Sequence, residues 1–139
     1  MPRPLRVRWA AVVLVAAVIC YFSVFTTPDA GVTPTGPLGL VGMDKWAHAV
    51  GYGVLGAALA VALAGERGPA ADGRATAALA VAGATGYGVA MEIAQLTAPL
   101  RHTSVGDVVA DALGATAAVA VWWAFSRRVA RRDEADLRS

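Results

Sequence analysis

Four long apolar stretches constrain what this chain can fold into more than any other feature of its sequence. A helix needs about 20 mostly apolar residues to cross the hydrocarbon core of a bilayer. The candidate segments are 9–27, 46–64, 75–98 and 104–125. Only 16% of the residues are charged, against roughly 25% in soluble globular domains. The sequence therefore predicts an all-α, integral membrane bundle of four transmembrane helices in a single domain.

The first apolar stretch has two interpretations, a cleaved signal peptide or a retained anchor helix. Arg3, Arg6 and Arg8 precede it, as they would in either case. Its uncharged core of nineteen residues exceeds the roughly 7–15 residues of a signal-peptide core, and no A-x-A cleavage site follows. We therefore expect a retained anchor.

Positive charges are distributed unequally between the two sides of the predicted bundle. Three arginines precede the first helix, two lie in the 65–74 connection and five follow the fourth helix, whereas only Lys45 and Arg101 fall on the other side. Because lysine and arginine are retained in the cytoplasm, both termini are predicted to be cytoplasmic. The predicted parts are a cytoplasmic amino terminus (1–8), a transmembrane domain (9–126) and a charged cytoplasmic tail (127–139). One lysine beside eleven arginines, in an alanine-rich chain, indicates a GC-rich bacterial genome, and together with the four apolar helices this predicts a location in the bacterial cell membrane.

Polar residues interrupt the apolar stretches near the helix ends predicted to face outward. They are Asp44, Lys45, His48, Glu92, Gln95, Asp107 and Asp111. Asp44 and His48 are spaced i, i+4, as are Asp107 and Asp111, so each pair shares a helix face. Burial of a charge in lipid is expensive, and such residues usually face a protein interior. We therefore predict one polar cluster between the helices, toward the outer leaflet.

Small residues indicate which side of the third helix faces its neighbours. Ala80, Ala84 and Gly88 lead at four-residue steps to Glu92. Small residues at such steps mark close helix contacts in membranes. This stripe predicts that Glu92 points at another helix.

Short motifs in the same region resemble those of a known family. "DKWAH" at 44–48 and "EIAQ" at 92–95, followed by Arg101, Ser104, Asp107 and Gly114, resemble the VanZ-like family of bacterial membrane proteins over about residues 43–120. The family commonly has Asn where this chain has Asp111. The resemblance implies a multi-pass cell-envelope protein. The founding member is linked to low-level resistance to the glycopeptide teicoplanin, and the family supplies no established reaction.

The favoured function is recognition of a lipid-linked or amphipathic ligand at the polar outer-leaflet site. The predicted ligand-binding residues are Asp44, Lys45, His48, Glu92, Gln95, Arg101, Ser104, Asp107 and Asp111. Expected partners are membrane lipids or a lipid-linked envelope precursor, and an oligomer stays open. Nucleic acid is not expected, because the arginines form no basic face with interleaved aromatic residues.

Other functions stay open at this point. One is a membrane-embedded hydrolase or transferase acting on a lipid head group, with His48, Glu92 or Asp107 as catalytic candidates and Arg101 holding phosphate. Another is proton-coupled transport through Glu92 and Asp111, and a third is a purely structural ion-pair network. The sequence alone leaves open whether any reaction is catalysed.

Each polar residue also has a local interpretation. Ser104-x-x-Asp107 has the form of a capping box for the fourth helix. His48 can form a local pair with Asp44. Asp111, the deeper carboxyl of the fourth helix, is expected to hold a proton and donate a hydrogen bond, a role that Asn would also serve.

The same cluster also contains side chains that can bind a metal ion. His48, Glu92, Asp107 and Asp111 have suitable ligand chemistry. No compact ligand motif such as H-E-x-x-H is present. We therefore expect no metal and no cofactor.

Overall fold

The computed structural model describes residues 4–25, 34–68, 72–97 and 104–137. These residues are helical apart from short connections and one isolated β-bridge between Thr35 and Gly42. The elements are α1 (Leu5–Cys20), the π-helical turn η1 (Tyr21–Phe25), the 3₁₀ turn η2 (Pro37–Gly39), α2 (Met43–Arg67), α3 (Gly73–Gln95) and α4 (Val105–Asp136). Four helices, counting α1 and η1 as one, are long and apolar enough to cross a membrane. The predicted all-α class is confirmed, as is the presence of four helices long and apolar enough to span a membrane.

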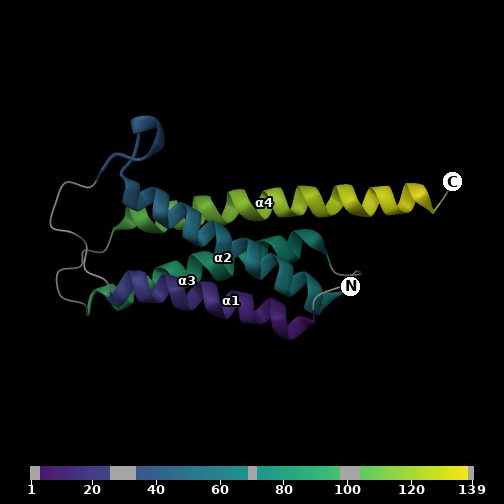
Figure 1. Ribbon diagram of the computed structural model, residues 1–139, viewed down its shortest axis with the longest axis horizontal. Coiled ribbons are helices and arrows are strands. Elements are labelled where there is room, and N and C mark those ends of the chain that lie inside the picture. Colours follow the sequence, from purple (N-terminus) through teal and green to yellow (C-terminus); the bar gives the residue numbers. More distant parts are fainter. Residues whose placement is uncertain (1–3, 26–33, 69–71, 98–103, 138–139) are drawn as a thin grey trace.

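Consecutive helices run in opposite directions (Figure 1). The start of α1, the end of α2, the start of α3 and the end of α4 lie at one end of the bundle, which we call the termini end. The end of η1, the start of α2, the end of α3 and the start of α4 lie at the other, which we call the cluster end. This alternation brings the polar residues of α2, α3 and α4 to the cluster end.

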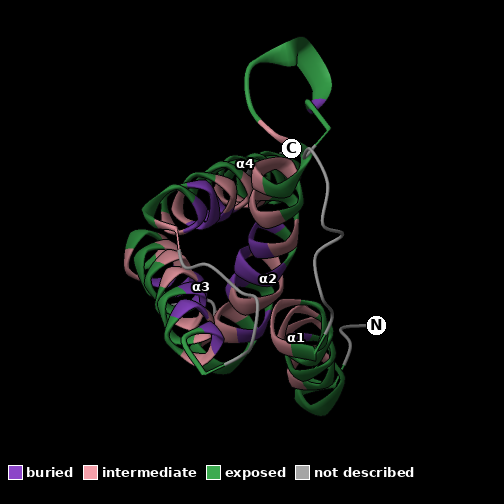
Figure 2. Ribbon diagram, turned by 90° about the vertical axis from the view of Figure 1, so that its left-hand side faces the viewer, coloured by how far each residue is buried: buried purple, intermediate pink, exposed green. Residues whose placement is uncertain are grey.

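Helix α2 is the central element of the bundle. It packs against α1, α3 and α4, and its contact with α4 is the most extensive (Figure 2). Glycines permit this approach, since a Cβ added at Gly114 would lie 1.9 Å from the carbonyl oxygen of Ala49. One added at Gly56 would lie 3.2 Å from the Cα of Ala115. Small residues let membrane helices approach to backbone contact, and here they fix α2 against α4.

The small-residue stripe of α3 faces the interior as predicted. Ala80, Ala84, Gly88 and Glu92 are all buried, and Thr76, one step earlier, is buried as well. Side chains four residues apart lie on one helix face. The stripe therefore carries Glu92 into the bundle rather than toward lipid.

Several helix boundaries differ by a few residues from the sequence-based ones, and two of the differences concern the start of α2 and the end of α4. Helix α2 begins at Met43, so Asp44 and Lys45 belong to its first turn. Helix α4 continues past Phe125 to Asp136. The segment 127–136 contains neither Gly nor Pro, the two residues that most disfavour a helix, so nothing stops the helix at the predicted boundary.

Candidate functional site

Three ionisable side chains from three helices meet at the cluster end. His48 comes from α2, Glu92 from α3 and Asp107 from α4, and one ligand atom of each lies within 4.8 Å of the others. Glu92 is 8% exposed and Asp107 is 9% exposed. The predicted convergence of these residues is confirmed.

Lys45 links two carboxylates beside this group. Its ammonium donates to Asp107 Oδ1 at 2.5 Å and to Asp44 Oδ2 at 2.7 Å. Because Lys45 lies in the first turn of α2 and Asp107 in the first turn of α4, the ion pair ties the two helix starts together. Lys45 thus bonds to a carboxylate of its own helix and to one of α4.

His48 is bound by Asp111 rather than by Asp44. Its Nδ1 lies 2.8 Å from Asp111 Oδ1, and Asp111 is 0% exposed. The expected local pair of His48 with Asp44 was therefore wrong. The close approach of the α2 backbone at Ala49 to Gly114 brings the α4 carboxylate within reach of the imidazole, while Asp44 pairs with Lys45.

The start of α4 is capped by residues from two helices. Ser104 Oγ accepts from the backbone N–H of Gly106 at 3.1 Å. In a capping box the side chain three residues on binds the N-cap N–H, but here that N–H donates to Glu92 Oε2 of α3 at 2.8 Å. The Asp107 half of the predicted box was therefore wrong, because Glu92 takes its place and Asp107 pairs with Lys45.

Gln95 lies near the site but binds the first span. Its Nε2 donates to the carbonyl of Ser23 in η1 at 3.0 Å. The last carbonyls of a helix have no partner within the helix, so this amide satisfies one of them and ties α3 to the first span. Arg101, the remaining predicted site residue, lies outside the described residues.

Two tyrosines beside the site were not predicted. The ring of Tyr52 lies 6.0 Å from that of His48 and 6.4 Å from that of Tyr87, centroid to centroid. Tyr87 donates to the carbonyl of Ala16 at 2.7 Å. The spacing of Tyr52 four residues after His48 places both on one helix face, and this spacing was the available signal.

A cavity of about 360 Å³ opens beside His48. One wall is apolar and comes from the first span, with Val18, Ile19 and Phe22. The other wall includes the polar side chains of Asp44, His48 and Gln95. The cavity thus combines a hydrocarbon surface with hydrogen-bonding groups.

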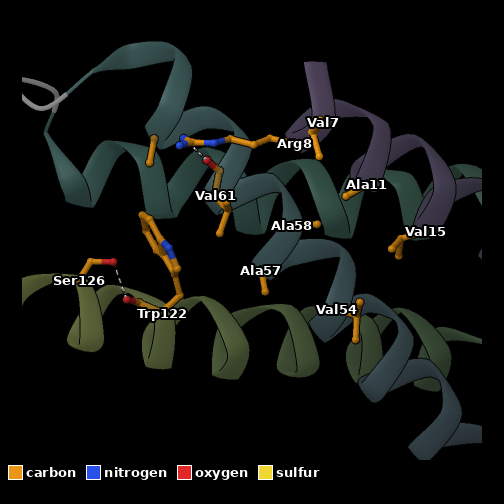
Figure 3. Close-up of a pocket in the computed structure, with 11 residues that line it drawn as sticks. Val7, Arg8, Ala11, Val15, Val54, Ala57, Ala58, Val61, Trp122 and Ser126 are labelled. Atoms are coloured by element: carbon orange, nitrogen blue, oxygen red, sulfur yellow. Dashed lines mark hydrogen bonds between the residues drawn. The ribbon is translucent and has the colours of Figure 1, made fainter. Parts of the chain in front are cut away.

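A larger groove of about 710 Å³ lies nearer the termini end, between α1, α2 and α4. Figure 3 shows Arg8 reaching across it to the carbonyl of Val61, at 3.4 Å, with Trp122 and Ser126 on the opposite wall. Arg8 is the single charged side chain among its described lining residues. The groove therefore lacks the clustered ionisable groups of the cluster end.

Comparisons of the chain with protein-family models, with curated proteins and with solved structures found no match.

Proposed function

We propose that the chain is a multi-pass membrane protein of the bacterial cell envelope that recognises a lipid-linked or amphipathic ligand at the cluster end. The observation that carries this proposal is the cavity beside His48, which has one apolar wall and one polar wall. An acyl or prenyl chain matches the apolar wall, and a polar head group matches the side chains of Asp44, His48 and Gln95. The motif resemblance to VanZ-like proteins adds support, and with it a relation to glycopeptide antibiotics.

The proposed orientation has the cluster end outside and both termini in the cytoplasm. It is supported by the ten arginines of the two terminal segments and the 65–74 connection, against Lys45 and Arg101 in the segments that the sequence predicts to face outward. Single cysteines at Thr35 and Ala70, in a Cys20→Ser background, test it with an impermeant thiol reagent in intact cells. We expect labelling at Thr35 alone, and labelling at Ala70 alone would reverse the orientation.

Ligand binding is tested by mass spectrometry of lipid that co-purifies with the full-length protein. Gly51 lines the cavity, and a Cβ added there would lie 3.8 Å from Ile19 Cγ1. Gly51→Leu should therefore fill the cavity and remove a lipid that wild type retains. Gly86→Leu is the matched control, since a Cβ at Gly86 meets nothing within 4 Å. Equal lipid in wild type and Gly51→Leu would contradict the proposal.

A hydrolase or transferase acting on a lipid head group is the second candidate function. It is favoured by the contact of His48 with Asp111, since a carboxylate that orients an imidazole is a recurring arrangement for a general base. Glu92 and Asp107 lie within reach of the same imidazole, and Arg101 would hold phosphate. Release of phosphate from a polyprenyl phosphate in liposomes, abolished by His48→Gln, would establish this activity. No turnover in wild type would leave a binding protein.

A further inference from the structure

We propose that His48, Glu92 and Asp107 coordinate a divalent transition-metal ion at the cluster end, with Zn²⁺ as the reference ion. The proposal deepens the proposed function, because it concerns the same site, and it revises the expectation of no metal. One atom of each side chain lies within 4.8 Å of the others. Three ligand atoms about 2.1 Å from one tetrahedral Zn²⁺ lie roughly 3.4 Å apart. Side-chain rotations that shorten each separation by up to about 1.4 Å would therefore bring all three onto one ion.

Neighbouring residues hold each of the three ligands in place. Lys45 binds Asp107 Oδ1, the Ser104 N–H binds Glu92 Oε2, and Asp111 binds His48 Nδ1. A metal-binding histidine typically donates its other ring N–H to a carboxylate, which fixes the ring. The contact between His48 and Asp111 has this form.

The balance of buried charge independently favours a cation. Glu92, Asp107 and Asp111 are buried, and within the described part of the chain Lys45 is the one lysine or arginine bonded to any of them. Asp111 Oδ2 is buried and has no hydrogen-bond partner in that part of the chain. Uncompensated buried carboxylates are costly. A divalent ion supplies two positive charges, whereas Arg101, outside the described residues, supplies one.

The hydroxyl of Tyr52 is a second buried polar group without a described partner. Tyr52 is 2% exposed. Its ring and Asp111 Oδ2 lie on the same side of Gly88, at 3.2 Å and 2.4 Å from where a Cβ of that glycine would sit. The Tyr52 ring and the carboxylate that contacts His48 therefore lie beside the same glycine of α3. A hydrated ion would supply hydrogen-bonding groups to this region.

The donor set indicates the class of ion and of ligand. One imidazole and two carboxylates suit a borderline ion such as Zn²⁺ or Mn²⁺ better than Ca²⁺ or Mg²⁺, which prefer oxygen ligands alone. Three protein ligands leave a coordination position open, as in sites where zinc binds a substrate or water. An anionic head group, phosphate or carboxylate, is the chemical class that would fill it.

Metal binding is tested on the full-length protein in detergent after treatment with EDTA. We expect one Zn²⁺ per chain in a calorimetric titration, and a higher midpoint of thermal unfolding with Zn²⁺ than with Mg²⁺. Co²⁺ should give a visible absorption spectrum typical of nitrogen and oxygen ligands. Failure of wild type to bind Zn²⁺, Mn²⁺ or Co²⁺ at one per chain would overturn the proposal without any variant.

Single substitutions test which side chains bind the ion. Glu92→Gln and Asp107→Asn should each weaken Zn²⁺ binding more than about 100-fold, and Asp111→Asn about 10-fold, as is typical of a residue that orients a ligand. Asp44→Asn is the matched control, because Asp44 binds the same lysine as Asp107 but lies outside the ligand group. If Asp44→Asn weakens binding as much as Asp107→Asn, the ion is held by surface charge and the proposal is wrong.

The metal proposal and the proposed function can be contradicted by different results. Co-purified lipid is measured with and without EDTA in wild type and in Gly51→Leu. Lipid that is retained by a protein unable to bind metal would remove the metal proposal alone. Stoichiometric metal without any lipid bound in the cavity would remove the lipid-recognition function alone.

Discussion

The two ends of the bundle hold their helices together by different chemistry. Toward the termini end, Ala60, Ala80 and Val119 form an apolar cluster from α2, α3 and α4 with almost no exposed surface. At the cluster end the same helices are joined through ionisable side chains, with Lys45 on Asp107 and His48 on Asp111. Alanine and valine need no partners, whereas buried charges do. The difference indicates that apolar packing joins the helices toward the termini end, whereas polar contacts join them at the cluster end.

The largest loss of stability is expected at Gly114, where α2 and α4 are in backbone contact. Gly114→Ala places a methyl group against the carbonyl of Ala49, so α2 and α4 must move apart, at a cost of about 3 kcal/mol of unfolding free energy. The measurement is the thermal unfolding midpoint in detergent. Gly86→Ala is the control and should be neutral, since its Cβ meets nothing nearby. A Gly114→Ala protein as stable as wild type would show that α2 and α4 are not in backbone contact.

Removal of the lysine tests whether the cluster end depends on its ion pairs. Lys45→Met keeps the side-chain length but leaves Asp107 without its cation, so we expect a loss of about 2 kcal/mol, somewhat below that for a fully buried pair. The double variant Lys45→Met with Asp107→Asn should recover more than half of that loss, because it also removes the unpaired charge. Unfolding is measured in EDTA to exclude bound metal. Additive losses in the double variant would mean that the two side chains do not interact.

Two serines on α4 allow the two ends to be compared within one helix. Ser104→Ala removes the hydroxyl that caps the helix at the cluster end and should cost about 1 kcal/mol. Ser126 donates to the carbonyl of Trp122 inside the helix, and such bonds contribute little, so Ser126→Ala should change stability by less than about 0.5 kcal/mol. Equal changes in the unfolding midpoint would contradict the proposed capping role.

The smallest change in stability is expected for Asp111→Asn. This substitution keeps a hydrogen-bonding oxygen beside His48 Nδ1, so we expect a change in unfolding free energy of less than about 0.5 kcal/mol. Asp111→Leu removes the acceptor and should cost about 1–3 kcal/mol. A large loss in Asp111→Asn, measured without metal, would show that the charge itself stabilises the fold.

The sequence predicted which polar residues gather at the cluster end, but it predicted only in part which of them bond to each other. Helical spacing and the small-residue stripe predicted that Glu92 and Asp107 face neighbouring helices, and both are buried beside His48. The predicted partner of His48 was wrong and the partner of Glu92 was not predicted, because spacing along the sequence indicates only partners on the same helix. The actual partners, Asp111 and the Ser104 N–H, come from another helix. Gln95 was placed with the carboxylates, yet it binds Ser23 of the first span.

The sequence by itself determined the helical class, the four spans and the gathering of polar residues at one end. These follow from hydrocarbon thickness, from the period of the helix and from the alternation of helix direction. The tertiary structure decided which ionisable side chains pair with each other. That choice depends on how closely α2 approaches α4, and the approach is set by a glycine at 114 lying against the backbone at Ala49. A shift of a few ångströms at that contact would take Asp111 out of reach of His48, and no periodicity along the chain records such a distance.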